Sequence, residues 1–261
     1  DFSWTTDFIF SHTTSEVTDL DAQSRIISMI SGSGFTKKGY PYRALFSINF
    51  QGLNNRGLPT FINENGEKTV SNHFFQSYDL SHLVYEGPTD PTITGSFGNI
   101  FKYKNLSLNV FITYSGGNVV RLDPTFASAY SDLSAMPREF INRWTKPGDE
   151  AFTNIPAIAD LRQIQSDTRL AYAYNAYNYS TARTASGDFI RMKEISVGYE
   201  FPARLVRHLG INSLGMKLQG TNLFLIYSDK KLNGQDPEFF NSGGVAVPMA
   251  RQFTFTLRVG I

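Results

Sequence analysis

The chain ends on a run in which every second residue is apolar. In RQFTFTLRVGI the alternate positions are Phe253, Phe255, Leu257, Val259 and Ile261, separated by polar residues or glycine. A period of two puts neighbouring side chains on opposite faces of a β-strand, so this run predicts a strand with one apolar and one polar face. The pattern alone does not say whether the apolar face contacts a protein core or lipid.

Six further runs alternate in the same way, and each predicts a strand. They cover residues 2–11, 42–52, 92–103, 106–116, 189–201 and 216–227. The seven runs are about 10 to 13 residues long, whereas globular strands average about five or six residues and a tilted membrane-spanning strand needs about nine to eleven. Their second faces carry Ser, Thr, Asn, Gln, Lys, Glu and Gly, as in a wet lumen. We therefore expect an all-β fold with about seven strands of a large antiparallel transmembrane β-barrel.

The joins between the predicted strands differ in length. A tight turn at Lys104 and Asn105 separates the third strand from the fourth, and a short helix between Pro202 and Gly210 separates the fifth from the sixth. The other joins are long. Counted from the C-terminus, the long joins share one side, as the extracellular loops of bacterial barrels do. The join over residues 13–40 fits poorly, because it is longer than a periplasmic turn should be.

Seven strands do not close a barrel of this kind, because single-chain bacterial barrels use an even number from eight upward. We expect the missing strands to lie outside this sequence. No internal repeat or low-complexity linker divides residues 1–261, so we expect them to form one continuous portion of the barrel domain. The chain opens on Asp1 with no initiator Met and no signal-peptide pattern, which indicates a piece of a longer polypeptide.

Composition excludes several classes of function. The net charge of +1 and the scattered Lys and Arg residues give no electrostatic basis for nucleic-acid binding. Without cysteine there is no disulfide, no thiolate metal site and no Cys nucleophile. No run of 18 apolar residues exists, so no transmembrane helix is expected.

No catalytic or metal-binding pattern stands out. The four histidines are scattered and form no helical pair: His12, His73, His82 and His208. Asp236 and Glu238 in QDPEFF could bind calcium, but they lack the Asp/Asn ladder of a calcium loop, so we prefer a structural turn stiffened by Pro237. Neither a nucleophile elbow nor a phosphate-cradling glycine motif is present. We therefore expect no enzyme activity, no metal and no cofactor.

Five segments resemble, in order, motifs of one protein family. They are EGPTDPTITGSFGNIFKYKNLSLNV (86–110), NRWTKPGDEAFTNIP (142–156), GDFIRMKEISVGYEFPARLVRHLGI (187–211), GTNLFLIYSDKKLNGQDPEF (220–239) and VPMARQFTFTLRVGI (247–261). The family they resemble is SusC/RagA, the TonB-dependent outer-membrane transporters of Bacteroidetes. The region before Glu86 matches more loosely.

The resemblance implies the C-terminal part of a 22-stranded barrel in the outer membrane, with the plug domain and the TonB-contacting segment outside this chain. It implies nutrient import of an oligosaccharide or a peptide, powered through TonB and helped by a SusD-like surface lipoprotein that acts as a lid. This chain would also contact the remaining barrel strands and the plug of the same transporter, and the lipid of the outer membrane. The chain departs from the family in ending on Ile261, where such barrels tend to end on an aromatic residue.

The longest loop carries a run of tyrosines. LAYAYNAYNYSTA places Tyr172, Tyr174, Tyr177 and Tyr179 among alanines and asparagines. Tyrosine rings and hydroxyls suit sugars and peptide groups, so these four are candidate contacts for a substrate or the lid. We prefer the simpler interpretation, in which the run extends the fifth strand above the membrane and its rings pack on neighbouring loops. All of residues 121–186 stays a candidate partner surface, because long loops are often functional.

Two other classes of protein remain open. A soluble all-β glycan-binding or interaction domain would bury the apolar faces against a second sheet, whereas a barrel would leave them as one continuous band facing lipid. An outer-membrane enzyme would need a Ser/His/acid constellation, against which the isolated histidines argue. Besides the closing strand, the residues expected in the band are Phe97, Phe101, Leu108, Val110, Ile112, Val197 and Tyr199. Those expected on the lumen face include Glu194, Glu200, Lys217 and Arg258.

Overall fold

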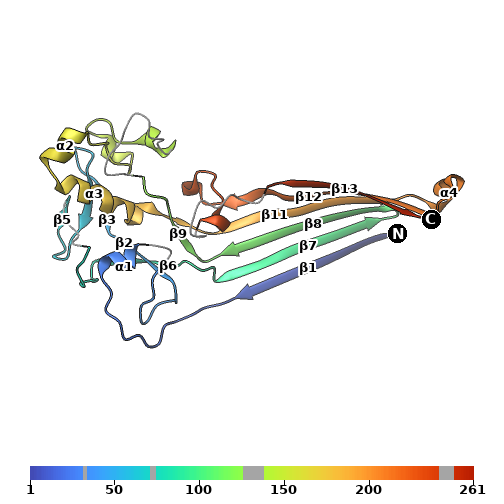
Figure 1. Cartoon of the computed structure of the whole chain (residues 1–261), viewed down its shortest axis with the longest axis horizontal. Coiled ribbons are helices and arrows are strands. Elements are labelled where there is room, and N and C mark those ends of the chain that lie inside the picture. Colours follow the sequence, from blue (N-terminus) through green and yellow to red (C-terminus); the bar gives the residue numbers. More distant parts are fainter. Residues whose placement is uncertain (32–33, 71–74, 126–137, 241–249) are drawn as a thin grey trace.

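The computed structural model describes residues 1–31, 34–70, 75–125, 138–240 and 250–261. The chain has two parts, a long twisted sheet and a packed region of short helices and strands beyond one end of that sheet (Figure 1). Both termini lie near the opposite end of the sheet (Figure 1). The packed region, called the loop region, comprises residues 13–92, 117–188 and 229–251 as far as they are described.

The sheet has six strands in the order β1-β7-β8-β11-β12-β13, and every neighbouring pair is antiparallel. The strands are β1 (Phe2–His12), β7 (Ile93–Tyr103), β8 (Leu106–Gly116), β11 (Phe189–Glu200), β12 (Ser213–Ser228) and β13 (Gln252–Gly260). They are 9 to 16 residues long, well above the length of ordinary globular strands. The prediction of a large antiparallel sheet of an all-β fold is confirmed, with six of the seven predicted runs in it.

The two short joins form as predicted at the end of the sheet that carries the termini. Between β7 and β8, Lys104 takes a φ of 51°, the left-handed conformation that a tight hairpin requires. Between β11 and β12 lie α4 (Ala203–Val206) and η4 (Arg207–Leu209), with Pro202 as the N-cap and Gly210 closing the turn at a φ of 72°. Glycine suits that last position because it has no Cβ to oppose a positive φ.

The predicted second strand, residues 42–52, does not belong to the large sheet. It forms β2 (Ala44–Ile48), which pairs with β6 (Leu83–Pro88), and β3 (Phe50–Leu53), which pairs with β4 (Pro59–Ile62) next to β5 (Lys68–Thr69). All five residues of β2 are buried, so both of its faces contact protein. The prediction that this run spans with the others is therefore wrong. Because residues 42–52 lie outside the large sheet, β1 joins β7 through residues 13–92, on the side of the long joins. Residues 13–40 are therefore part of a long join, and their length no longer conflicts with the predicted pattern of joins.

The remaining elements of the loop region are short. They are α1 (Ile26–Ile30), β9 (Val119–Arg121), η1 (Arg138–Asn142), η2 (Asp149–Ala151), α2 (Leu161–Ser166), α3 (Arg169–Asn178), η3 (Thr181–Arg183), β10 (Thr184–Ser186), η5 (Lys230–Leu232) and η6 (Pro237–Phe239). Their main core contains Ile26, Ile48, Phe61, Phe140, Tyr174 and Tyr177. This packing gives the long joins a fixed structure, with α1, β2, β4, η1 and α3 held together by one apolar cluster.

Within the described residues, no helix is both long enough and apolar enough to span a membrane.

Candidate functional site

One face of the sheet is apolar from edge to edge. Residues directly opposite one another in a ladder lie on the same face, so the register defines rows of side chains. One row runs across all six strands through Trp4, Phe101, Leu108, Val197, Leu218 and Phe255. The next row runs through Phe2, Tyr103, Leu106, Tyr199, Met216 and Leu257. The predicted band is therefore continuous.

The apolar band is uncovered in this chain. Trp4 is 62% exposed, Leu218 is 58% exposed and Phe255 is 59% exposed. Among the described residues, the other sheets are the small ones of the loop region, and none of them lies against this face. The polar Asn99 within the band accepts hydrogen bonds at its Oδ1 from Trp4 Nε1 and Thr6 Oγ1, both at 2.9 Å. A polar atom facing an apolar medium needs such partners, because leaving it unpaired is costly.

The closing strand β13 places its predicted residues on this band. Phe253, Leu257 and Val259 lie opposite Gly220, Met216 and Leu214 of β12. Phe253 is the most exposed of the three at 74%. Ile261 follows the end of β13 and is also exposed.

The other face of the sheet carries the polar residues. Lys217 Nζ lies 3.8 Å from Glu194 Oε1, and Asn109 Nδ2 donates to the same carboxylate oxygen at 3.1 Å. Arg258 and Glu200 lie on either side of Gly215 in the ladder. The pairing is loose and partly exposed, so it contributes little to stability. These polar and charged side chains make this face hydrophilic, as the inner face of a water-filled lumen is.

Near the loop region, an ion-pair cluster with a buried Arg191–Asp236 pair and a half-exposed Glu238 joins β11 to the turn at residues 229–240. The Arg191 guanidinium pairs with the Asp236 carboxylate and lies 3.3 Å from Glu238 Oε2. Its Cζ also lies over the Phe189 ring, 5.4 Å from the ring centroid. Asp236 also accepts from the Glu238 backbone N–H at 3.2 Å, which caps η6. The two carboxylates thus belong to a structural turn held by Arg191, as the preferred interpretation has it. Two of the family-like segments, 187–211 and 220–239, meet at this cluster.

Among the described residues, no group of three or more His, Cys, Asp or Glu side chains gathers in a way that could hold a metal ion. His12 ends β1 and His208 lies in η4, at opposite ends of the sheet. His82 lies in the loop region, where burial lowers the pKa of its imidazole. His73 lies outside the described residues.

The four candidate tyrosines lie on or next to α3, so the expectation of an extended fifth strand is wrong. Tyr174 and Tyr177 are buried in the main core, and Tyr179 packs partly buried against it. The Tyr174 hydroxyl donates to the Ala157 carbonyl at 2.6 Å, and the Tyr177 ring packs edge-on against Phe50 at 5.6 Å. Tyr172 points the other way and is 63% exposed. The helical spacing of Leu170, Tyr174 and Tyr177 was a signal for this helix that the sequence interpretation missed.

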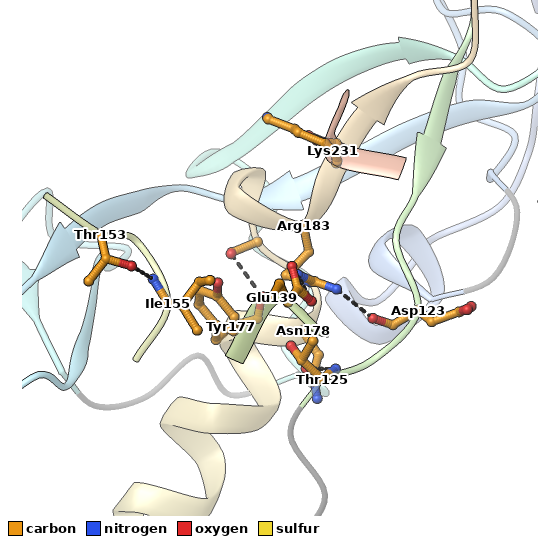
Figure 2. A network of polar contacts seen from close by, with 11 residues as sticks. Asp123, Thr125, Glu139, Thr153, Ile155, Tyr177, Asn178, Arg183 and Lys231 are labelled. Atoms are coloured by element: carbon orange, nitrogen blue, oxygen red, sulfur yellow. Dashed lines mark hydrogen bonds and ion pairs between the residues drawn. The ribbon is translucent and has the colours of Figure 1, made fainter. Parts of the chain in front are cut away.

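Two arginines, the buried Arg183 and the partly buried Arg121, hold the long joins together, and sequence reasoning missed both. Arg183 bonds Glu139 Oε1 at 2.7 Å and the Asp123 carbonyl at 2.8 Å, as Figure 2 shows. Arg121 donates to the Phe46 carbonyl at 2.6 Å and to the Ser180 carbonyl at 3.2 Å. These partners lie 44 to 75 residues apart in sequence, so no local pattern reveals them.

Burial shifts the pKa values of two groups here, Arg121 and Tyr177. Removal from water lowers the pKa of Arg121 to about 10, although the Glu86 carboxylate acts in the opposite direction. The guanidinium stays protonated at neutral pH. Burial raises the pKa of Tyr177 to about 12, with Arg183 opposing the rise. Arg121 and Tyr177 therefore keep their ordinary ionisation states at neutral pH.

Comparisons with known proteins agree with the motifs. No known protein-family profile matches the chain. TonB-dependent receptor P3 and TonB-dependent receptor P39, both of Formosa agariphila, are each 23% identical to it over 91% and 95% of its length. The chain spans 23% and 26% of these relatives, about a quarter of their length. The relatives are named as receptors, in agreement with the expectation that the chain is not an enzyme.

Solved structures show the same fold. The RagAB peptide transporter superposes with a TM-score of 0.71 at 19% identity, covering 99% of this chain and 27% of that chain. The RagAB peptide importer in its open-open state gives a TM-score of 0.67 at 18% identity, covering 100% of this chain and 27% of that chain. Sequence and fold together confirm the resemblance that the five segments indicate. The chain is similar in sequence to TonB-dependent receptors, and it has the fold of about a quarter of the barrel-forming chain of a SusC/RagA-type transporter.

Proposed function

We propose that residues 1–261 form the C-terminal portion of the barrel of a TonB-dependent importer in the outer membrane of a Gram-negative, Bacteroidetes-like cell. In this proposal the six long strands cross the membrane, the loop region faces the outside, and the short joins face the periplasm. The complete transporter would add the remaining strands, the plug and the TonB-contacting segment.

The observation that carries the proposal is the uncovered apolar band. Its rows cross all six strands with large exposed side chains such as Trp4, Leu218 and Phe255, while the opposite face pairs Lys217 with Glu194. Large apolar side chains in such a contiguous patch mark a surface that is covered in the working molecule. Strands long enough to span the hydrocarbon core and a polar second face favour lipid as the cover.

A soluble interaction domain is the alternative class. It would need a second layer over the band, and the described residues of the chain supply none. The similarity to TonB-dependent receptors also favours the importer.

We further propose that the importer works with a SusD-like surface lipoprotein and carries an oligosaccharide or a peptide. The similar RagAB structures are of a peptide transporter, which supports import of oligomers. Among the four candidate tyrosines, Tyr172 is the one whose ring is free to contact a cargo or the lid, at 63% exposure. Tyr174, Tyr177 and Tyr179 would act indirectly by holding α3 in place.

The test is to isolate the native polypeptide that carries this C-terminal sequence. A membrane-extracted chain several times heavier than 29.3 kDa that co-purifies with a second surface protein supports the importer. A native chain of 29.3 kDa that stays in solution without detergent would replace it with the soluble domain.

A further inference from the structure

The loop region contains a pocket of about 810 Å³. Its walls come from the turn between β3 and β4, from β5, from residues 143–145 and from α2 and α3. These elements lie at the end of the molecule farthest from the termini (Figure 1). A pocket of this size is large enough to hold an oligomer of a few units.

Positive charge dominates the pocket wall. Among the described residues that line it there is one carboxylate, that of Asp167, against four cationic side chains: Arg56, Lys68, Arg143 and Arg169. Asp167 is already held by the Arg169 guanidinium at 2.8 and 3.1 Å. Arg143 Nη1 donates to the carbonyl of Phe140, three residues earlier in the chain, at 3.1 Å. Among the described residues, no carboxylate lies within ion-pair distance of Arg56, Lys68 or Arg143.

The backbone around the pocket is held in place before any ligand arrives. The Trp144 ring lies on Gly57, where a Cβ would stand 2.4 Å from it, and Gly57 takes a φ of 71°. The Ala157 N–H donates to the Gly57 carbonyl at 2.9 Å, and the Trp144 indole N–H donates to Glu150 Oε2 at the same distance. A pocket that needs little ordering on binding loses less free energy to conformational entropy.

We propose that this pocket binds the carboxylate or sulfate groups of an anionic oligosaccharide at the cell surface, a step that rests on the proposed role in import. Planar guanidinium groups match such oxyanions with two parallel hydrogen bonds. Neutral hydrogen-bonding side chains between the cations suit sugar hydroxyls, and they are Asn54, Thr69, Thr145, Gln163 and Ser166. This combination favours an acidic sugar chain over an acidic peptide.

The test uses the full-length transporter, purified in detergent, and isothermal titration calorimetry. The probes are trigalacturonate, a sulfated trisaccharide, neutral maltotriose and triglutamate. We expect both anionic sugars to bind, maltotriose not to bind, and the affinity to fall as NaCl is raised, because surface ion contacts are screened by salt. The combined change Arg56→Gln and Arg143→Gln is expected to weaken binding about tenfold or more, in line with the loss of charge-assisted hydrogen bonds.

Arg162→Gln is the matched control, because Arg162 is exposed on α2 but does not line the pocket. Lys68→Gln serves as a second pocket variant if the double change fails to fold. Equal binding of neutral and anionic trisaccharides, or unchanged affinity in the pocket variants, would overturn the inference. Tighter binding of triglutamate than of trigalacturonate would overturn the assignment to sugars.

The same preparations separate this inference from the proposed function. If the transporter fractionates with the outer membrane but its pocket shows no preference for anions, only the pocket assignment fails. If the protein does not fractionate with the outer membrane at all, the proposed function fails whatever the pocket binds.

Discussion

Phe255 and Thr254 are neighbours in β13 whose side chains lie on opposite faces of the sheet, opposite Leu218 and Gln219 of β12. If the apolar face contacts lipid, Phe255→Arg places a charge in hydrocarbon. We expect it to lower the free energy of unfolding by about 2–4 kcal/mol if the site lies near the bilayer midplane. The measurements are the yield of folded transporter in the outer membrane and its unfolding in lipid vesicles.

Thr254→Arg is the control on the other face, where an added guanidinium can reach water. We expect this variant to insert and unfold almost as the parent does. If the two arginine variants behave alike, the assignment of the apolar face to lipid is wrong.

Arg191 is the residue on which the turn at residues 229–240 depends. Its side chain and that of Asp236 are 8% and 9% exposed, so Arg191→Met leaves a buried carboxylate without its cation. Removal of one partner of a buried pair typically lowers stability by about 3–5 kcal/mol. We expect a lower melting temperature and faster proteolytic cleavage within residues 229–240.

Lys38→Gln tests the same chemistry at an exposed ion pair. Lys38 Nζ lies 3.5 Å from Asp19 Oδ1, with both side chains largely in solvent. Exposed pairs contribute about 0–1 kcal/mol, so little change is expected. A similar loss of stability in both variants would show that the buried Arg191–Asp236 pair contributes no more to stability than an exposed ion pair does.

Among the elements of the sheet, β7 shows best how closely neighbouring strands are fitted. A Cβ at Gly95 would stand 2.1 Å from the Ile9 carbonyl oxygen and 2.3 Å from the Tyr114 hydroxyl, whose own hydrogen bond to Ile9 O is 3.0 Å long. Gly95→Ala must therefore displace the backbone of β1 or the Tyr114 ring. We expect a loss of about 1–3 kcal/mol, the usual effect of overpacking, measured as a fall in thermal stability.

Gly98→Ala, three residues further along β7, is the matched comparison. There the nearest atom to a new Cβ is Phe111 Cδ2 at 3.3 Å, and the next is Asp7 Cβ at 3.7 Å. A small shift of one ring makes room, so this variant should stay close to the parent. Equal effects at the two glycines would show that the contacts over Gly95 are not tight in solution.

For the whole molecule, the main expectation is a fixed orientation across the membrane. The chain contains no cysteine, so single cysteines can report on its two ends once the rest of the transporter is made cysteine-free. Phe152 is 92% exposed in the loop region, and Arg204 is exposed in α4 at the other end of the sheet. Phe152→Cys should react with a membrane-impermeant maleimide on intact cells, and Arg204→Cys only after the outer membrane is opened. Labelling of Arg204→Cys on intact cells would contradict the proposed orientation.

Alternation with a period of two was enough to predict β1, β7, β8, β11, β12 and β13 and the apolar face along most of their length. It did not predict the register shift in β11 between Met192 and Glu194, which puts Met192 opposite Ile112 on the apolar face. Whether a side chain points up or down along a strand is a local property of the backbone, so the sequence carries it directly. The same holds for the turn at Lys104 and the helix closed by Gly210, where single residue types satisfy a local backbone requirement.

Tertiary structure alone decided which alternating run joins the sheet and how the long joins pack. Residues 42–52 alternate as the others do, but β2 is covered on both faces by partners distant in sequence. The helical spacing of Leu170, Tyr174 and Tyr177 is present in the sequence, but only the fold shows that Tyr174 and Tyr177 are buried in one cluster with Phe61. Arg121 and Arg183 find their partners only once these segments meet. Contacts between distant segments leave no periodic mark in the chain, and so sequence patterns predicted the wall of the barrel far better than its loops.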